Sequence, residues 1–183
     1  VRILDKQKFA REPQIKVTLY QAVPKQGKME TIIQKSVELG VYSIVPVITA
    51  RTIVTEKHGI EKKLDRWKRV SAEAVKQCKR GIVPEVKKSL NFNEMLDDLA
   101  QYDLVLFPYE DENDASIKDV LRNLKDKKEN IAVIIGPEGG FSQEEAQAVV
   151  DAGGKSVSLG KTILRTETAG PATLAMIMYE LEI

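Results

Sequence analysis

The chain has 183 residues, of which 43% are hydrophobic and 30% charged, so it can bury one sizeable core and is not globally disordered. No apolar run reaches the roughly 18 residues of a membrane span. The single cysteine, Cys78, excludes an internal disulfide framework and fits a reducing compartment, so we expect a cytoplasmic protein. The single histidine, His58, argues against a histidine-based metal site, and we expect no metal.

The net charge of +1 hides an asymmetry between the two halves of the chain. Residues 1–90 contain 20 Lys+Arg and 9 Asp+Glu (net +11), whereas residues 91–183 contain 8 and 18 (net −10). The densest basic stretch lies between Arg51 and Lys88. This split indicates contact with a polyanion on one part of the fold, although a solvated helix face would also carry such charges.

Hydrophobic periodicity predicts strands that alternate with helices. The predicted strands are 15–20, 41–48, 103–107, 131–135 and 155–159, and the predicted helices are 28–39, 61–80, 93–100, 115–124, 142–150 and 168–181. Pro46 places the second strand near an edge or an end of the sheet. Asn93, Asp114 and Ser142 are the expected helix N-caps. The alternation predicts an α/β fold with a mostly parallel sheet and helices on both faces.

The last predicted helix is apolar nearly all round between residues 172 and 181. A helix of this kind must be covered on most of its faces. Burial within the domain and a homodimer interface both satisfy that requirement, and we favour the homodimer.

The strongest local motif is Gly136-Pro137-Glu138-Gly139-Gly140-Phe141-Ser142, between the most apolar strand and a capped helix. Ligands of parallel α/β sheets bind at the carboxyl ends of strands, where glycines allow close backbone approach. The glycine spacing is wrong for a dinucleotide fingerprint. The segment Gly153-Gly154-Lys155-Ser156 is not a Walker A loop either, because Val149 stands where its first glycine is required.

A second glycine-bearing segment, 159–168, joins the last strand to the last helix. Its final residues, Thr166, Glu167 and Thr168, suit a helix N-terminus. Ile163 and Leu164 are apolar residues in a loop, which makes sense if they line a pocket. Two such turns facing one crevice predict a small-molecule site.

Together these segments resemble the RsmE family, the bacterial 16S ribosomal RNA uridine-N3 methyltransferases of the SPOUT superfamily. The resemblance covers about residues 15–183. Further motifs fall in family order at Lys28-Met29-Glu30, Gln34-Lys35-Ser36, Glu38-Leu39-Gly40, Arg51, Trp67, Gln77-Cys78, Arg80 and Pro84. The chain departs from the family pattern at Thr162, where arginine is frequent, at Lys76, where an acidic residue is usual, and at Pro171.

The resemblance implies a C-terminal trefoil-knotted domain at 15–183 that works as a homodimer. Residues 1–14 would be the C-terminal remnant of a PUA-like RNA-binding β domain. The implied activity is S-adenosylmethionine-dependent methylation of uracil N3 in a specific uridine of 16S ribosomal RNA, in the small ribosomal subunit. The alternatives are a SPOUT enzyme that methylates a ribose 2′-hydroxyl and a ribosome-binding factor without catalysis.

Uracil N3 is a weak nucleophile until its proton leaves, so the site needs a base or a cation that stabilises the uracilate oxygens. Arg165 is the expected cation, because its guanidinium donors match oxygen acceptors. Glu138 is a candidate base and Glu167 an alternative. Equally, Glu138 could bond backbone amides of its loop and Glu167 could complement the helix dipole.

Two kinds of binding residue are expected, for the cofactor in the two glycine-bearing segments and for RNA phosphates in the basic half of the chain. The expected cofactor-binding residues are Gly136, Pro137, Gly139, Gly140, Leu159, Gly160, Ile163, Leu164 and Thr166. The expected phosphate contacts are Arg51, Arg66, Arg69, Lys79 and Arg80. Trp67 could stack on an RNA base, but its helical spacing favours a core position.

Overall fold

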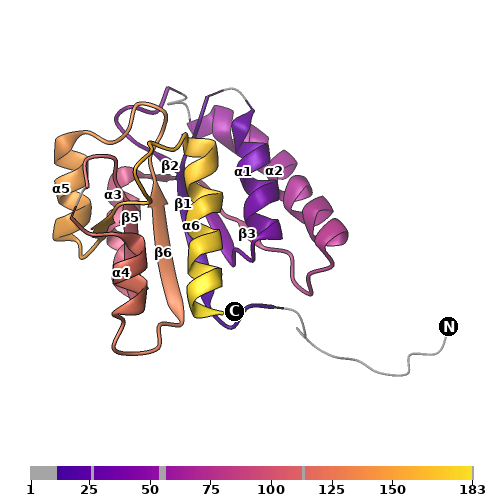
Figure 1. Cartoon of the computed structure of the whole chain (residues 1–183). Helices are drawn as coiled ribbons and strands as arrows, with labels where there is room; N and C mark the ends of the chain where they lie inside the picture. Colours follow the sequence, from indigo (N-terminus) through magenta and orange to yellow (C-terminus); the bar gives the residue numbers. More distant parts are fainter. Residues whose placement is uncertain (1–11, 26, 54–56, 113, 183) are drawn as a thin grey trace, which may run out of the picture.

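The structure is a computed structural model that describes residues 12–25, 27–53, 57–112 and 114–182. Its described strands form one sheet in the order β3-β2-β1-β6-β5-β7, with β4 also paired to β2, and every pairing is parallel (Figure 1). The strands are β1 Lys16–Ala22, β2 Ser43–Ile48, β3 Glu85–Val86, β4 Leu90–Asn91, β5 Leu104–Pro108, β6 Asn130–Ile135 and β7 Lys155–Val157. The predicted α/β class with a parallel sheet is therefore confirmed.

Helices cover both faces of this sheet, as predicted. They are α1 Lys28–Glu38, α2 Lys57–Cys78, α3 Phe92–Asp98, the 3-10 helix η1 Leu99–Gln101, α4 Ile117–Arg122, α5 Gln143–Asp151 and α6 Thr166–Leu181. One core layer joins the sheet to α1, α2, α4 and α6, and the other joins it to α3 and α5. Within the described residues, no helix is long and apolar enough to cross a membrane.

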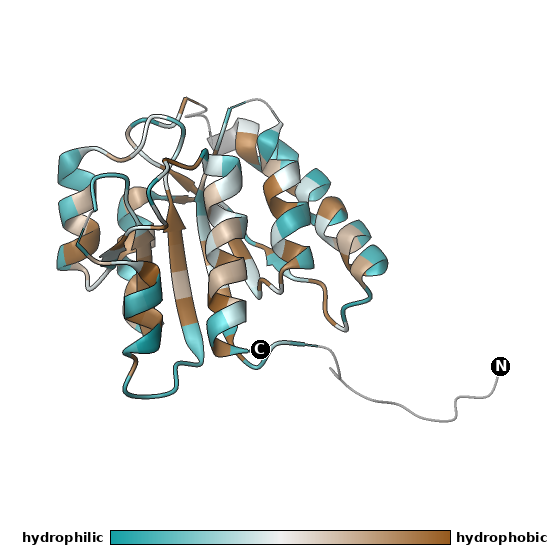
Figure 2. Ribbon diagram, in the orientation of Figure 1, coloured by the Kyte–Doolittle hydropathy of each residue, from teal (hydrophilic) through white to brown (hydrophobic). Residues whose placement is uncertain are grey.

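The two core layers follow from the alternation of side chains along each strand. In β6, which is brown along most of its length in Figure 2, Ile131 and Val133 enter one layer and Ala132 and Ile134 the other. Trp67 of α2 is 2% exposed and belongs to the first layer. Its core position is confirmed, and it does not present a face for base stacking.

The strand β2, which contains Pro46, lies next to the edge of the sheet, as expected, but it is not itself an edge strand. It pairs with β1 on one side, and on the other with β3 at Ser43 and Ile44 and with β4 at Val47. Pro46 falls between those two short pairings, where its missing N–H leaves no gap in a ladder. Strands of two residues carry too little periodicity to be predicted.

Helix ends also differ from the sequence predictions. Asn91, not Asn93, caps α3, and Ser116, not Asp114, caps α4, each accepting a backbone N–H three residues on. The predicted capping box at Ser142 is confirmed. The helix α2 ends near Lys79, which adopts a left-handed conformation (φ 60°).

A buried ion pair joins Glu12, the first described residue, to Arg80, which follows the end of α2. The Arg80 guanidinium donates to the Glu12 carboxylate at 2.7 Å, and the two side chains are 7% and 8% exposed. The backbone N–H groups of Gly81 and Ile82 donate to the same carboxylate at 2.7 and 3.1 Å. Residues 1–11 lie outside the described chain, so the remnant predicted for 1–14 stays a prediction.

This ion pair predicts a pH-dependent stability. Burial alone would raise the pKa of Glu12, but Arg80 and the two N–H groups outweigh it and hold the pKa below its ordinary value of 4.5. The stabilisation is therefore complete above about pH 4.5 and is lost as the pH falls through the lower folded-state pKa. In urea titrations, the stability gap between wild type and Glu12→Gln should shrink on acidification. A gap that is constant with pH would contradict the assignment.

Candidate functional site

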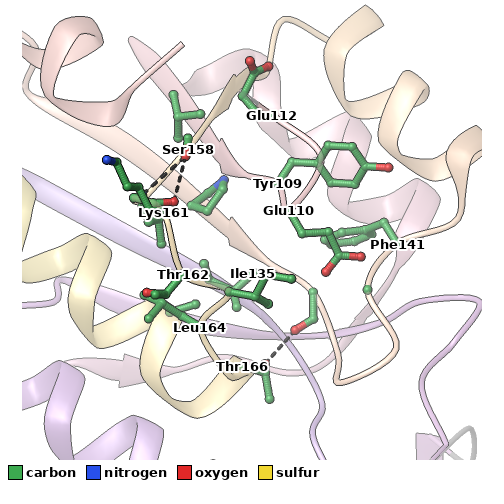
Figure 3. A pocket seen from close by; sticks show the side chains of 18 of the residues that line it. Tyr109, Glu110, Glu112, Ile135, Phe141, Ser158, Lys161, Thr162, Leu164 and Thr166 are labelled. Carbon is green, nitrogen blue, oxygen red and sulfur yellow. Dashed lines mark hydrogen bonds between the residues drawn. The ribbon is translucent and has the colours of Figure 1, made fainter. Parts of the chain in front are cut away.

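A pocket opens at the carboxyl ends of β5, β6 and β7, where parallel sheets bind ligands. Figure 3 shows Glu110 and Phe141 on one side of it and Thr162 and Leu164 on the other. The lining residues are Pro108, Tyr109, Glu110, Glu112, Ile135, Gly136, Pro137, Gly140, Phe141, Val157, Ser158, Leu159, Gly160, Lys161, Thr162, Ile163, Leu164, Thr166 and Ala169. The two glycine-bearing turns predicted from the sequence thus face the same pocket.

The expected cofactor-binding residues all line this pocket except Gly139. A Cβ at Gly139 would lie 3.5 Å from the Cβ of Arg51, in ordinary contact outside the pocket. Gly140, in contrast, has a φ of +67°, and a Cβ there would lie 2.8 Å from the Glu110 carboxylate. A glycine at position 140 therefore allows both the left-handed turn and the approach of Glu110.

A buried hydrogen-bond chain supports one wall of the pocket. The Thr166 hydroxyl donates to the Gly136 carbonyl at 2.6 Å and accepts from the Gln21 side-chain amide at 2.9 Å. Gln21 is 0% exposed near the end of the central strand β1. This chain joins the start of α6 to the end of β6, so both glycine-bearing segments are tied to one rigid centre.

A second set of contacts holds the glycine-rich loop from the segment after β2. The Arg51 guanidinium donates to the Gly139 carbonyl at 2.7 Å. The backbone N–H of Ala50 donates to the Glu145 carboxylate at 2.8 Å, and Glu145 is 8% exposed. The guanidinium of Arg51, an expected phosphate contact, thus helps to hold the glycine-rich loop.

The two carboxylates considered as bases, Glu138 and Glu167, share one cation. The Lys28 ammonium lies 3.2 Å from each of them. Burial raises the pKa of Glu138, but backbone N–H groups and Lys28 outweigh it, and the pKa is lowered. The pKa of Glu167 is lowered by its own backbone N–H and by Lys28. A lowered pKa makes a carboxylate a weaker base, which favours the other interpretation of Glu138, that it bonds backbone amides.

Arg165 lies at the rim of the pocket. Its neighbours Leu164 and Thr166 both line the pocket, while Arg165 itself is exposed. Its backbone carbonyl accepts hydrogen bonds from the N–H groups of Thr168 and Ala169 in the first turn of α6. No hydrogen bond or ion pair joins its guanidinium to the rest of the described chain, and its charge helps to lower the pKa of Glu167.

Of the expected phosphate contacts, Arg66 and Arg69 share a shallow groove between α1 and α2. Arg66 forms an ion pair with Glu30 at 3.1 Å, and its side chain is 71% exposed. Lys79 is exposed at the end of the same helix. The prediction for Arg80 is wrong, because its guanidinium is buried and is used by Glu12 and by the carbonyls of Val37 and Val41.

Sequence reasoning missed several residues of the site. Tyr109 and Glu110 follow the predicted strand 103–107, so the rule that ligands bind at strand ends could have found them. Gln21 could have been noticed as an amide inside an apolar strand. The role of Lys28 has no local signal, because its partners lie 110 and 139 residues away.

Comparison with known proteins agrees with this architecture. An RNA methyltransferase domain family matches residues 10–178. "Ribosomal RNA small subunit methyltransferase E" of Bacillus subtilis is 33% identical over 177 residues, which cover 94% of this chain and 69% of that protein. The protein of the same name from Aquifex aeolicus is 39% identical over 163 residues, covering 88% and 68%. The chain belongs to the RsmE family.

A solved structure of an RsmE protein extends the likeness to three dimensions. The crystal structure of ribosomal RNA small subunit methyltransferase E from Neisseria gonorrhoeae, bound to S-adenosyl methionine, superposes with a TM-score of 0.81 at 33% identity. The match covers 92% of this chain and 68% of that one. The resemblance to the RsmE family drawn from the sequence is therefore confirmed.

Proposed function

We propose that this chain is the methyltransferase domain of an S-adenosylmethionine-dependent enzyme that modifies small-subunit ribosomal RNA, at N3 of a uracil in 16S ribosomal RNA. The observation that carries the proposal is the convergence of two glycine-bearing turns, 136–140 and 159–164, on one pocket at the sheet end. The sequence similarity to small-subunit ribosomal RNA methyltransferases supports the class of substrate.

The residues of the pocket fit this cofactor. Leu159 and Leu164 offer apolar contacts for an adenine ring, and the absence of a Cβ at Gly136 and Gly140 lets Phe141 and Glu110 lie close to the glycine-rich turn. Glu110 has no hydrogen-bond or ion-pair partner among the described residues, so its carboxylate is free to accept from a ribose hydroxyl or an ammonium group. When bound, the cofactor supplies an electrophilic methyl group on a sulfonium.

The chain then has to position the uracil and stabilise its anion. Arg165 would donate to the uracil oxygens as the N3 proton passes to solvent water, and these hydrogen bonds would stabilise the negative charge that develops on the oxygens. The N3 lone pair forms the new bond to the methyl carbon as the carbon–sulfur bond breaks. Glu138 and Glu167 remain ionised on Lys28 and hold the two turns in place. Exposed phosphate contacts at Arg66, Arg69 and Lys79 would orient the RNA without reading its sequence.

The proposed assembly is a homodimer. Tyr179 of α6 is 69% exposed, and Ile163, which lines the pocket, is 81% exposed. Covering these side chains by a second copy would explain why α6 is apolar on nearly every side. Light scattering should then give twice the chain mass, and Tyr179→Arg should yield monomers.

The proposal also includes the trefoil knot and the preceding PUA-like domain. The chain leaves β7 at the sheet edge and returns to α6 over the central strands, past the loop 136–141 (Figure 1). This return of the chain supports the proposed knot. Glu12 and its contacts with Arg80 would set the direction in which the preceding domain departs. A crystal structure of the full-length protein tests both points.

The activity can be tested with the full-length protein, labelled S-adenosylmethionine and undermethylated small ribosomal subunits. Mass spectrometry of digested RNA should detect N3-methyluridine. Methylation found only on ribose would support the 2′-hydroxyl alternative. A folded protein that binds no S-adenosylmethionine in calorimetry would support the ribosome-binding factor.

Arg165→Ala should lower kcat by about 10²- to 10³-fold, because no cation then stabilises the negative charge of the uracil in the transition state. The affinity for S-adenosylmethionine should stay within about twofold, because Arg165 does not line the pocket. Arg122→Ala is the matched control, since Arg122 is an exposed arginine that pairs with Glu180. An unchanged kcat in Arg165→Ala would exclude this role.

A further inference from the structure

Lys28 joins three segments that are far apart in the sequence. Its ammonium lies 3.2 Å from Glu138 in the glycine-rich loop and 3.2 Å from Glu167 in the first turn of α6. Lys28 is itself the first residue of α1. The backbone N–H of Lys25 also donates to Glu138, at 3.1 Å. Lys25 and the first residue of α1 therefore contact the glycine-rich loop and the start of α6 outside the pocket.

Each contact ends next to a residue that lines the pocket. Glu138 follows Pro137, and Glu167 follows Thr166, whose hydroxyl donates to the Gly136 carbonyl. Lys28 does not line the pocket. A change at Lys28 can thus reach the pocket only by moving the two turns or by changing the electric field inside it.

The two ion pairs of Lys28 with Glu138 and Glu167 contribute little to the free energy of unfolding. The side chains of Lys28, Glu138 and Glu167 are 32%, 24% and 23% exposed, and ion pairs in contact with water are screened. The pKa of Lys28 is raised by Glu167 and Glu138, so all three groups are charged at neutral pH. Lys28 therefore balances the charge of only one of the two carboxylates.

We propose that Lys28 is a positioning residue that holds the turn 136–140 and the start of α6, which follows the turn 159–164, at the separation the cofactor requires. The proposal rests on the proposed function, which it deepens. Lys28, the first residue of α1, would then control the affinity for the cofactor without touching it.

The sign of the effect separates positioning from simple electrostatics. S-adenosylmethionine carries a net positive charge, so removing Lys28 would, through the field alone, tighten its binding. If Lys28 positions the turns, its removal weakens binding instead. The affinity for S-adenosylhomocysteine, which lacks the sulfonium charge, should then fall by the same factor as the affinity for S-adenosylmethionine.

Calorimetry on the full-length protein with both ligands tests the proposal. Lys28→Met should weaken both by about tenfold, and Lys28→Arg should restore affinity to within about threefold, since a guanidinium can bridge two carboxylates. Lys76→Met is the matched control, because Lys76 is a similar ammonium paired with Glu73 on α2. It should leave both affinities unchanged.

A second variant protects the test against misfolding. Glu138→Gln should also weaken both ligands, and its effect should not add to that of Lys28→Met, because the two residues form one contact. Unchanged or tighter binding in Lys28→Met would overturn the positioning role. A folded wild type that binds neither ligand would instead overturn the proposed function.

Discussion

Replacing Arg80 by methionine should lower the free energy of unfolding by about 3–5 kcal/mol, because it leaves the Glu12 carboxylate buried without its cation. The carbonyls of Val37 and Val41 would lose a donor as well. Urea denaturation followed by circular dichroism measures the change. The expected loss is a large fraction of the stability of a typical domain.

Two further variants identify the cause of that loss. Arg122→Met removes an arginine whose side chain is 52% exposed, so its ion pair with Glu180 should be worth no more than about 1 kcal/mol. The double variant Glu12→Gln, Arg80→Met should be less unstable than the sum of its single variants, since no unpaired charge remains. Additive effects would show that the two side chains do not interact in solution.

The fold class followed from local pattern, but the order of the strands did not. Alternating apolar residues placed β1, and continuous apolar runs placed β5 and β6, within one or two residues of their observed bounds. Nothing local reveals that β6 lies between β1 and β5, because pairing depends on contacts between distant segments. The same limit explains Arg80, whose partner lies 68 residues earlier. Within a basic stretch of sequence, no local pattern distinguishes a buried arginine from an exposed one.

The candidate site was partly predictable for a physical reason. The carboxyl ends of parallel strands meet at one edge, so glycine-rich turns after β6 and β7 were expected to face one crevice. The side chains inside those turns were harder to assign. Glu138 and Gly139 are neighbours of pocket residues, but they point to Lys28 and Arg51. Direction within a turn depends on backbone angles that composition does not specify.

The pocket itself should respond sharply to one methyl group. In Gly136→Ala, the new Cβ would lie 2.9 Å from Phe141 Cε2, closer than real contacts allow. The ring cannot withdraw easily, because Phe141 is 5% exposed and packs against Phe107 with centroids 5.2 Å apart. The backbone of the turn must shift instead, at a cost of about 1–3 kcal/mol in stability. The shift should lower kcat/KM by about 10²-fold.

Gly139→Ala makes the comparison decisive, because it adds the same methyl group three residues away in the same loop. The nearest atom to its new Cβ is the Arg51 Cβ at 3.5 Å, and Gly139 does not line the pocket. Calorimetry with S-adenosylmethionine should therefore separate the two variants, with Gly139→Ala within about threefold of wild type and Gly136→Ala far weaker. Equal losses would mean that rigidity of the whole loop, and not the contact between Gly136 and Phe141, shapes the pocket.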